Sequence, residues 1–419
     1  MVDPETPEPA SPSSEATRVP RREGHAEIGA RAGQLLPVEL TTEIITTVDG
    51  IRSLKPDYER LARVSGNTLP FALHDWHLTW CDHFLNTRRR VEAQPLFFVL
   101  RNRSGDCVTI APLIQRRWRA WSLSLTTVDV IGTDPALTEI RGPLVEPGYE
   151  RPSVRALHEG LAALPDWDWV HWHGIGGALL AAMDEEIAPQ WYRVNDDYVL
   201  DLPSTWEQFR SGLRRNIRES LRHCYNSLQR DGHNYEFVVA RLPREIRPAL
   251  ERFVKLHAMR AVTGRGPKHP DHFAGRRQRE FLYDVCGRLA ERDAVRVFQL
   301  RIRGEVVAAR VAFVVGDGLY LYYSGFDPAW AHYSVMTTTV AESLRYAITQ
   351  GLKTANLSLT AEQSKLRWGP RRVELRSGLV HRELLRSRLA CALYRIAMSR
   401  SGVRGRLLHR LLRAGRPWG

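Results

Sequence analysis

The segment from Leu319 to Trp368 constrains the fold most strongly. It reads LYLYYSGFDPAWAHYSVMTTTVAESLRYAITQGLKTANLSLTAEQSKLRW. Residues 319–323 alternate as in a β-strand, and the Gly, Asp and Pro of the next five residues interrupt the alternation. Apolar residues at helical spacing then predict a helix that begins at Ser334 and ends at Gly351.

A strand that leads through a polar loop into a helix favours anion binding at the start of the helix. Backbone N–H groups without helical partners and the helix dipole act there together. The residues that we expect to form this cradle are Tyr333, Ser334, Val335, Met336 and Thr337.

The order of these elements, with Lys365 and Trp368 after the next strand, resembles the acyl-CoA N-acyltransferase (GNAT) superfamily. Within it the sequence is most similar to the BioF2-like or CelD-like branch, which is associated with bacterial exopolysaccharide or cellulose formation and is related to FemAB-like proteins. The resemblance implies acetyl-CoA or another acyl-CoA as co-substrate, held by the predicted cradle and Lys365. Three motifs depart from the family pattern: Ser334-Val335-Met336 stands for Ser-Pro-Gly, Ser364 for Tyr, and Asn356-Leu-Ser-Leu-Thr360 for Asp-Phe-x-x-Gly.

Two predicted hairpins resemble each other. Residues 97–114 and 297–315 share a Leu-Arg-x-Arg core followed by a Gly-acid turn between apolar strands. Helical segments precede both, and further strand–helix alternation follows both. We therefore predict an α/β (α+β) fold of two tandem GNAT-like domains, each a mixed central sheet flanked by helices, as in CelD-like and FemAB-like proteins.

The predicted domains are a disordered segment at 1–37, a first GNAT-like half at 38–195, a second at 196–385 and a basic tail at 386–419. Residues 1–37 contain almost no large apolar groups, so they cannot offset chain entropy by burial. The net charge is +13, and no acidic residue follows Glu383. Leucines among the tail's arginines predict a basic amphipathic helix suited to an anionic membrane, although a helix docked on the domain fits as well.

Acyl transfer to an amine needs a proton acceptor and a proton donor for the departing thiolate. Asp327 matches an Asp of the family and is the candidate base, although Asp before Pro is also a common turn former. Tyr322 or Tyr323 is the candidate acid. Strand alternation predicts that only one of these two rings reaches a shared cleft.

A single amphipathic helix is predicted from Trp206 towards Gly232. CelD-like proteins carry a similar basic helix here, so the resemblance implies that Arg214, Arg215 and Arg218, together with Trp368, bind substrate. A solvated helix face is the alternative for the arginines.

No metal site is predicted. The five cysteines are scattered and never spaced as CxxC, and His171-Trp172-His173 has no third ligand at metal spacing. No signal peptide or membrane span is evident, which predicts a cytoplasmic protein, peripheral to the inner membrane face if the tail binds lipid.

The sequence thus favours a CoA-dependent N-acyltransferase. Its acceptor would be an amine, such as an amino sugar or another intermediate of exopolysaccharide, cellulose or cell-envelope biosynthesis. Two alternatives stay open: a FemAB-like transferase that uses aminoacyl-tRNA, in which case the basic surfaces face RNA, and a catalytically degenerate assembly factor for a polysaccharide synthase.

Overall fold

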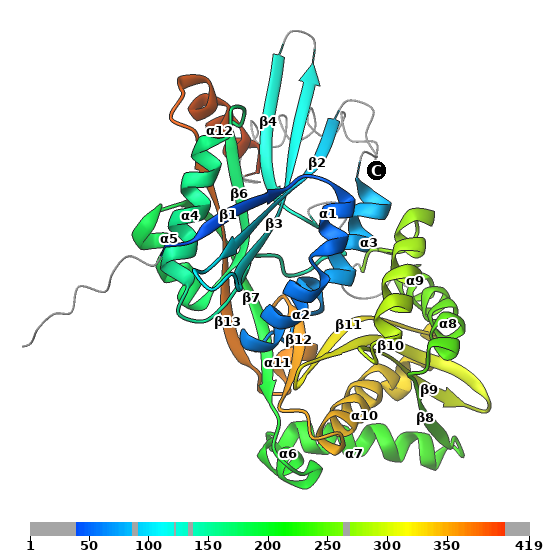
Figure 1. Cartoon of the computed structure of the whole chain (residues 1–419). Helices are drawn as coiled ribbons and strands as arrows, with labels where there is room; N and C mark the ends of the chain where they lie inside the picture. Colours follow the sequence, from blue (N-terminus) through cyan, green and yellow to red (C-terminus); the bar gives the residue numbers. More distant parts are fainter. Residues whose placement is uncertain (1–38, 86–90, 121–122, 133–136, 263–268, 399–419) are drawn as a thin grey trace, which may run out of the picture. The chain divides into compact units, whose positions relative to one another are not determined.

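The strands pair into one continuous sheet (Figure 1). A computed structural model describes residues 39–85, 91–120, 123–132, 137–262 and 269–398. The strands are β1 (Thr41–Ile45), β2 (Val91–Arg101), β3 (Cys107–Ala120), β4 (Leu123–Val130), β5 (Leu144–Val145), β6 (Trp169–Ile175), β7 (Gln190–Asp201), β8 (Tyr235–Ala240), β9 (Val295–Ile302), β10 (Glu305–Val315), β11 (Gly318–Phe326), β12 (Thr354–Leu359) and β13 (Arg371–His381). The order across the sheet is β1-β2-β3-β4-β6-β13-β7-β12-β11-β10-β9-β8, with β5 beside β3.

Counted inward from either edge, the sheet shows the same succession of strands, so that β1, β2, β3, β4, β6 and β13 correspond to β8, β9, β10, β11, β12 and β7. This symmetry confirms two tandem halves with the same topology. Each half has an antiparallel four-stranded meander, β1 to β4 and β8 to β11, whose last strand pairs in parallel with β6 or β12. The repeated hairpins β2–β3 and β9–β10 turn at Gly105 and Gly304, with φ angles of +84° and +83°. Glycine adopts this left-handed conformation without a Cβ penalty.

The two halves exchange their last strands. Strand β7 follows the first half in sequence yet pairs with β12 of the second, whereas β13 ends the second half and pairs with β6 of the first. The predicted boundary between residues 195 and 196 falls inside β7. The predicted disordered segment 1–37 and residues 399–419 of the predicted basic tail lie outside the described residues.

Helices flank the sheet on both faces (Figure 1). They are α1 (Val48–Ser53), α2 (Lys55–Val64), η1 (Pro70–Ala72), α3 (His74–Phe84), α4 (Glu150–Ala163), α5 (Gly177–Glu186), α6 (Trp206–Gly212), α7 (Arg215–Arg230), α8 (Pro243–Val262), α9 (Arg276–Ala290), η2 (Pro328–Tyr333), α10 (Val335–Thr349), α11 (Gln363–Leu366) and α12 (Leu385–Met398). In the second half, α6, α7 and α10 pack on one face, and α8 and α9 pack on the other. None of these described helices combines the length and apolar composition needed to cross a bilayer.

The predicted strand and helix of the key segment are confirmed as β11 and α10. The single helix predicted from Trp206 is wrong, because the chain breaks at Leu213, where ψ is 149°. Arg218 of α7 donates to the carbonyls of Ser211 and Leu213 at 2.9 and 2.8 Å, which satisfies acceptors at the end of α6. The apolar stripe continues across the break because Phe209, Leu213 and Ile217 are all buried.

Aromatic contacts fix the first half against β11. The ring of Phe71 in η1 lies 5.0 Å from that of Tyr320, and Trp76 of α3 lies 6.0 Å from Tyr322. Trp76 also donates through Nε1 to the Thr138 hydroxyl at 3.0 Å. The core therefore fixes the segment after β4 beside the second half.

Candidate active site

The parallel strands β11 and β12 separate part-way along their length. They pair only from Gly318↔Thr354 to Tyr320↔Asn356 and then diverge. A cavity of about 520 Å³ opens at this divergence and is lined by residues 321–324 of β11 and 357–359 of β12, with Thr360 beyond. Separated strands present backbone N–H and C=O groups that an extended ligand can bond.

A β-bulge places both candidate tyrosines at this cavity. Arg310 of β10 lies opposite Ser324, but Ala312 lies opposite Leu321, so β11 carries one extra residue in this interval. Tyr322 and Tyr323 therefore both line the cavity, with ring centroids 4.4 Å apart. The prediction that only one of them reaches the cleft is wrong, because the bulge breaks the period-2 rule.

A second bulge shapes β12. Asn356 lies opposite Val199 and Leu359 opposite Asp197, so β12 has an extra residue between them. Ser358 and Thr360 adopt φ angles of +71° and +79°, a region that costs a non-glycine residue roughly 1–2 kcal/mol. Strained backbone of this kind is frequent at ligand sites.

The N-terminus of α10 faces the same cavity, where Met336, Thr337 and Val340 contribute to the lining. The amides of Thr337 and Thr338 bond the carbonyl of Ser334 at 2.8 and 3.2 Å. The amides of Val335 and Met336 have no acceptor within the helix, as is general for a first turn. This is the geometry that binds phosphate.

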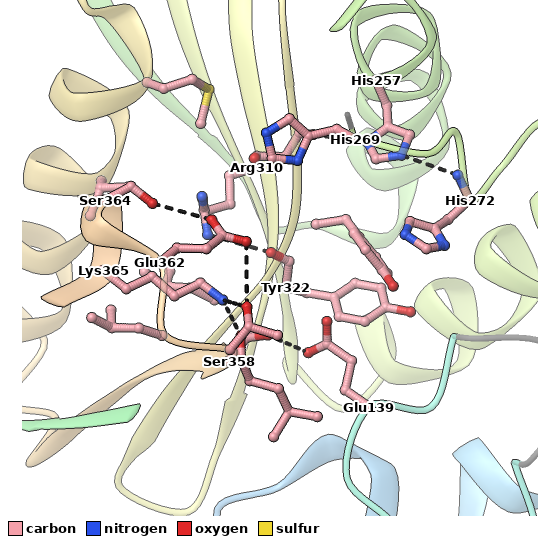
Figure 2. Close-up of a pocket in the computed structure, with 18 of the residues that line it drawn as sticks. Glu139, His257, His269, His272, Arg310, Tyr322, Ser358, Glu362, Ser364 and Lys365 are labelled. Atoms are coloured by element: carbon pink, nitrogen blue, oxygen red, sulfur yellow. Dashed lines mark hydrogen bonds between the residues drawn. The ribbon is translucent and has the colours of Figure 1, made fainter. Parts of the chain in front are cut away.

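Glu139 enters the cavity from the first half (Figure 2). Its Oε2 accepts a hydrogen bond from the Tyr320 hydroxyl and another from the Ser358 hydroxyl at 2.8 Å. Burial raises the pKa of Glu139, although both hydrogen bonds oppose the shift. A carboxyl group with a raised pKa is suited to accept a proton near neutral pH.

Four cationic side chains line the cavity, Arg141, Arg260, Arg310 and Lys365, together with the carboxyl groups of Glu139 and Glu362. Burial lowers the pKa of Lys365 and of Arg260, and burial together with Arg260 lowers the pKa of Arg310 to about 10. Figure 2 shows Lys365 and Arg310 directed towards the same space as Glu139. Cationic side chains outnumber acidic ones in the lining, so the cavity attracts anions.

Histidines form the opposite wall. His257 bonds the Ser324 carbonyl through Nδ1 at 2.8 Å, and its Nε2 accepts from the His272 amide at 3.4 Å. His269 accepts from Arg260 at 3.0 Å. Burial lowers the pKa of all three rings, which keeps them neutral near neutral pH.

The two tyrosines differ in their contacts. Burial raises the pKa of both Tyr322 and Tyr323, so both are protonated at neutral pH. Tyr322 donates its proton to the Leu137 carbonyl at 2.6 Å and so fixes the first-half segment to β11. The Tyr323 ring lies 4.8 Å from that of His272, on the histidine wall.

Sequence comparison identifies the family to which part of the second half belongs. Residues 214–366 match the family described as "Acetyltransferase (GNAT) domain". This part of the chain is a GNAT domain. The chain is accordingly an acyltransferase enzyme, and β11, η2, α10 and β12 are the part of its GNAT domain that surrounds the cavity.

Solved structures extend the likeness to most of the chain. FemX is 10% identical over 80% of this chain and 96% of its own, with a TM-score of 0.51, which shows a shared fold. A conserved protein of unknown function from Bacteroides thetaiotaomicron is 11% identical, covering 81% of this chain and 100% of its own, with a TM-score of 0.48. A tandem GNAT protein from the clavulanic acid biosynthesis pathway is 11% identical, covering 81% and 98%, with a TM-score of 0.44. A search of curated proteins finds no match.

Six of the predicted site residues line the GNAT cavity: Tyr322, Tyr323, Met336, Thr337, Lys365 and Trp368. The others contact the protein around it. Asp327 begins η2 and accepts from the Ala329 amide at 3.0 Å, Tyr333 donates to Asp231 at 2.9 Å, and Val335 is buried. Ser334, with φ +54°, lies against the Cys224 thiol.

The arginines predicted to bind substrate lie away from this cavity. Arg214 precedes α7, and Arg215 pairs with Glu219 at 2.8 Å on the exposed surface. Arg218 bonds the end of α6 and lines a second hollow with Trp206 and Arg222. Their role in substrate binding stays a prediction.

Several cavity residues are not named by the sequence analysis: Glu139, His257, Arg260, His269, His272 and Arg310. They come from different elements of both halves, so no local spacing identifies them. Likewise, the structure supplies a third potential ligand, Asp129, beside His171 and His173, with ligand atoms within 4.8 Å of one another. Tertiary packing brings Asp129 to the pair, which spacing along the sequence does not indicate, and Arg116 also approaches Asp129 at 3.5 Å.

Proposed function

We propose that the protein transfers an acyl group from acetyl-CoA or another acyl-CoA to an amine. The separation of β11 and β12 beside the N-terminus of α10 carries the proposal. The pantetheine arm would lie between the strands and bond their unpaired backbone groups. The pyrophosphate would lie at the α10 amides, where the helix dipole favours negative charge.

The reaction needs no covalent intermediate on the protein. The amine nitrogen attacks the thioester carbonyl, Glu139 accepts the amine proton, and the carbon–sulfur bond breaks. Tyr323, whose ring lies beside His272 in the cavity lining, gives its proton to the departing thiolate. Glu139 is better placed than Asp327 for the base, since it lines the cavity and has a raised pKa.

The resemblance to the CelD-like branch leads us to propose an amino sugar or another intermediate of exopolysaccharide or cell-envelope biosynthesis as the acceptor. Transfer from aminoacyl-tRNA is the competing hypothesis. The assembly-factor hypothesis predicts that no acyl-CoA binds.

We expect Thr337→Glu to weaken acetyl-CoA binding by at least about tenfold, because the new carboxylate repels the pyrophosphate at close range. A carboxylate at a helix N-terminus also stabilises the helix, so the fold should be retained. Calorimetric titration of acetyl-CoA measures the change.

Gln350→Glu, at the other end of α10, is the matched control and should bind acetyl-CoA normally. Binding unchanged in Thr337→Glu would place the cofactor elsewhere. Absence of binding to the unmodified protein at millimolar ligand would leave the aminoacyl-tRNA and assembly-factor hypotheses.

We also propose that α12 binds to the inner face of an anionic membrane. One side of α12 docks on the protein, where Ser387 donates to Asp168 at 2.7 Å and Cys391 is buried. The other side exposes an apolar stripe: Leu385 (73%), Leu389 (58%), Leu393 (56%) and Ile396 (47%). Arginines flank this stripe, which is the pattern of helices that lie in a lipid interface.

The protein should therefore sediment with phosphatidylglycerol vesicles and much less with phosphatidylcholine vesicles. Leu389→Glu should reduce the bound fraction by about tenfold, because it places a charge in the apolar stripe. Leu242→Glu alters a leucine that is also exposed but lies on another surface, and it should bind normally. Equal binding of the two variants would contradict a role for α12.

A further inference from the structure

Two cations in the cavity contact only neutral acceptors. The Lys365 ammonium bonds the Leu359 carbonyl and lies 3.5 Å from the Thr360 hydroxyl. Arg310 donates through one terminal nitrogen to the Tyr322 carbonyl at 3.4 Å. Its Nε is buried and has no hydrogen-bond partner among the described residues.

Glu362 and Glu139, two carboxylates that line the cavity, attract both cations, but the lining also includes Arg141 and Arg260, so cationic side chains outnumber acidic ones. A partly buried cation that lacks a direct carboxylate contact is costly, because burial removes part of its hydration. Neither Lys365 nor Arg310 forms an ion pair with a carboxylate of the described residues. The planar guanidinium group can bind a carboxylate through two parallel hydrogen bonds. An anionic group of a ligand would therefore satisfy both side chains.

The position of these cations points to the acceptor. The α10 amides already offer a separate phosphate site in the proposed function. Arg310 and Lys365 instead line the same cavity as Glu139, the proposed proton acceptor, and Glu362 lies beside them. A ligand that complements this arrangement presents an amine to Glu139 and an anion to the two cations (Figure 2).

We propose that the acceptor is an amine that also carries a carboxylate, which Arg310 and Lys365 bind. This inference rests on the proposed function and narrows its substrate class. An amino acid and a carboxylated amino sugar share this chemistry, whereas a neutral amino sugar lacks it. The carboxylate is unchanged in the reaction: the amine nitrogen gains the acyl carbon, its proton passes to Glu139, and CoA leaves as the thiol.

Matched acceptor mixtures test the proposal. The protein is incubated with acetyl-CoA and a mixture of the twenty common amino acids, or of their carboxamides, and separately with muramic acid or glucosamine. Mass spectrometry should detect acylated product at least about 100-fold faster from the carboxylated member of one pair. The pair that reacts identifies the source of the carboxylate.

Arg310→Met then tests whether Arg310 binds the carboxylate of the acceptor. Replacing a buried charge by an apolar side chain of similar length preserves packing, and a thermal melt checks this. We expect the acceptor KM to rise at least about tenfold with little change in the calorimetric Kd of CoA, and Arg310→Lys to restore part of the loss.

Equal rates with neutral acceptors would overturn the inference, as would a variant that loses CoA affinity while keeping its acceptor KM. Failure of every carboxylated amine in a protein that still binds CoA would also overturn it and leave the proposed function standing. A protein that does not bind CoA would refute both.

Discussion

Replacing Glu139 with glutamine should lower kcat by about 10²- to 10⁴-fold, the usual contribution of a general base. Glutamine keeps an oxygen that can accept from Tyr320 and Ser358, so the local hydrogen bonds survive. It also removes a buried negative charge. The variant should therefore be at least as stable as the parent near neutral pH, which separates a catalytic loss from unfolding.

The pH dependence follows from the direction of the pKa shift. A general base acts in its deprotonated form, and burial raises the pKa of Glu139 above the ordinary value of 4.5. Activity of the parent should thus fall as the pH decreases through this raised pKa. The acidic limb of its pH–rate profile should therefore lie above pH 4.5. In Glu139→Gln this limb should disappear.

Steady-state rates between pH 5 and pH 9, with calorimetric CoA binding beside them, provide the measurement. Glu305→Gln, at the exposed start of β10, is the matched control and should keep normal rates. A Glu139→Gln variant with normal kcat would show that water or another residue accepts the proton.

The sequence predicted the elements whose signals are local. Alternation over residues 319–323 and helical spacing after Ser334 identified β11 and α10, because each element buries one face of its own side chains. The repeated Gly-acid turns identified the two halves, because both hairpins need a glycine with positive φ. These patterns were sufficient for the fold class.

The site depended on features that no local pattern encodes. The bulge at Tyr322 and Tyr323 arises from pairing with β10, and the sequence of β11 alone still reads as a regular strand. Glu139 reaches the cavity only because Leu137 and Ile140 are buried on either side of it and Trp76 holds Thr138. Contacts of this range follow from tertiary packing, and a single sequence does not reveal them.

One departure from the family motif is compensated by a residue of β7. Where the family has Asp, this chain has Asn356, whose amide donates to Asp197 of β7 at 2.6 Å. Burial raises the pKa of Asp197, and its second oxygen is buried without a hydrogen-bond partner. Asn356 also accepts from the Ser358 amide at 2.7 Å, so the pair supports the strained turn that holds Glu139.

Asn356→Asp should therefore destabilise the fold by about 3 kcal/mol near neutral pH, because it places a second buried carboxylate against Asp197. The two carboxyl groups can share a proton, so their combined proton affinity is higher in the folded than in the unfolded state. The lost stability should return as the pH falls and should be lost again as the pH rises through the raised folded-state pKa.

Urea unfolding of the variant at several values between pH 5 and pH 8 measures this dependence. The exchange variant Asn356→Asp/Asp197→Asn keeps one carboxylate and one amide, and it should recover most of the stability and remove the added pH dependence. Asp197→Asn alone should be nearly neutral or stabilising, since it removes a buried charge. An Asn356→Asp protein as stable as the parent at neutral pH would mean that water reaches the pair. In that case the hydrogen bond between Asn356 of β12 and Asp197 of β7 would not determine the position of the turn at Ser358, which bonds Glu139.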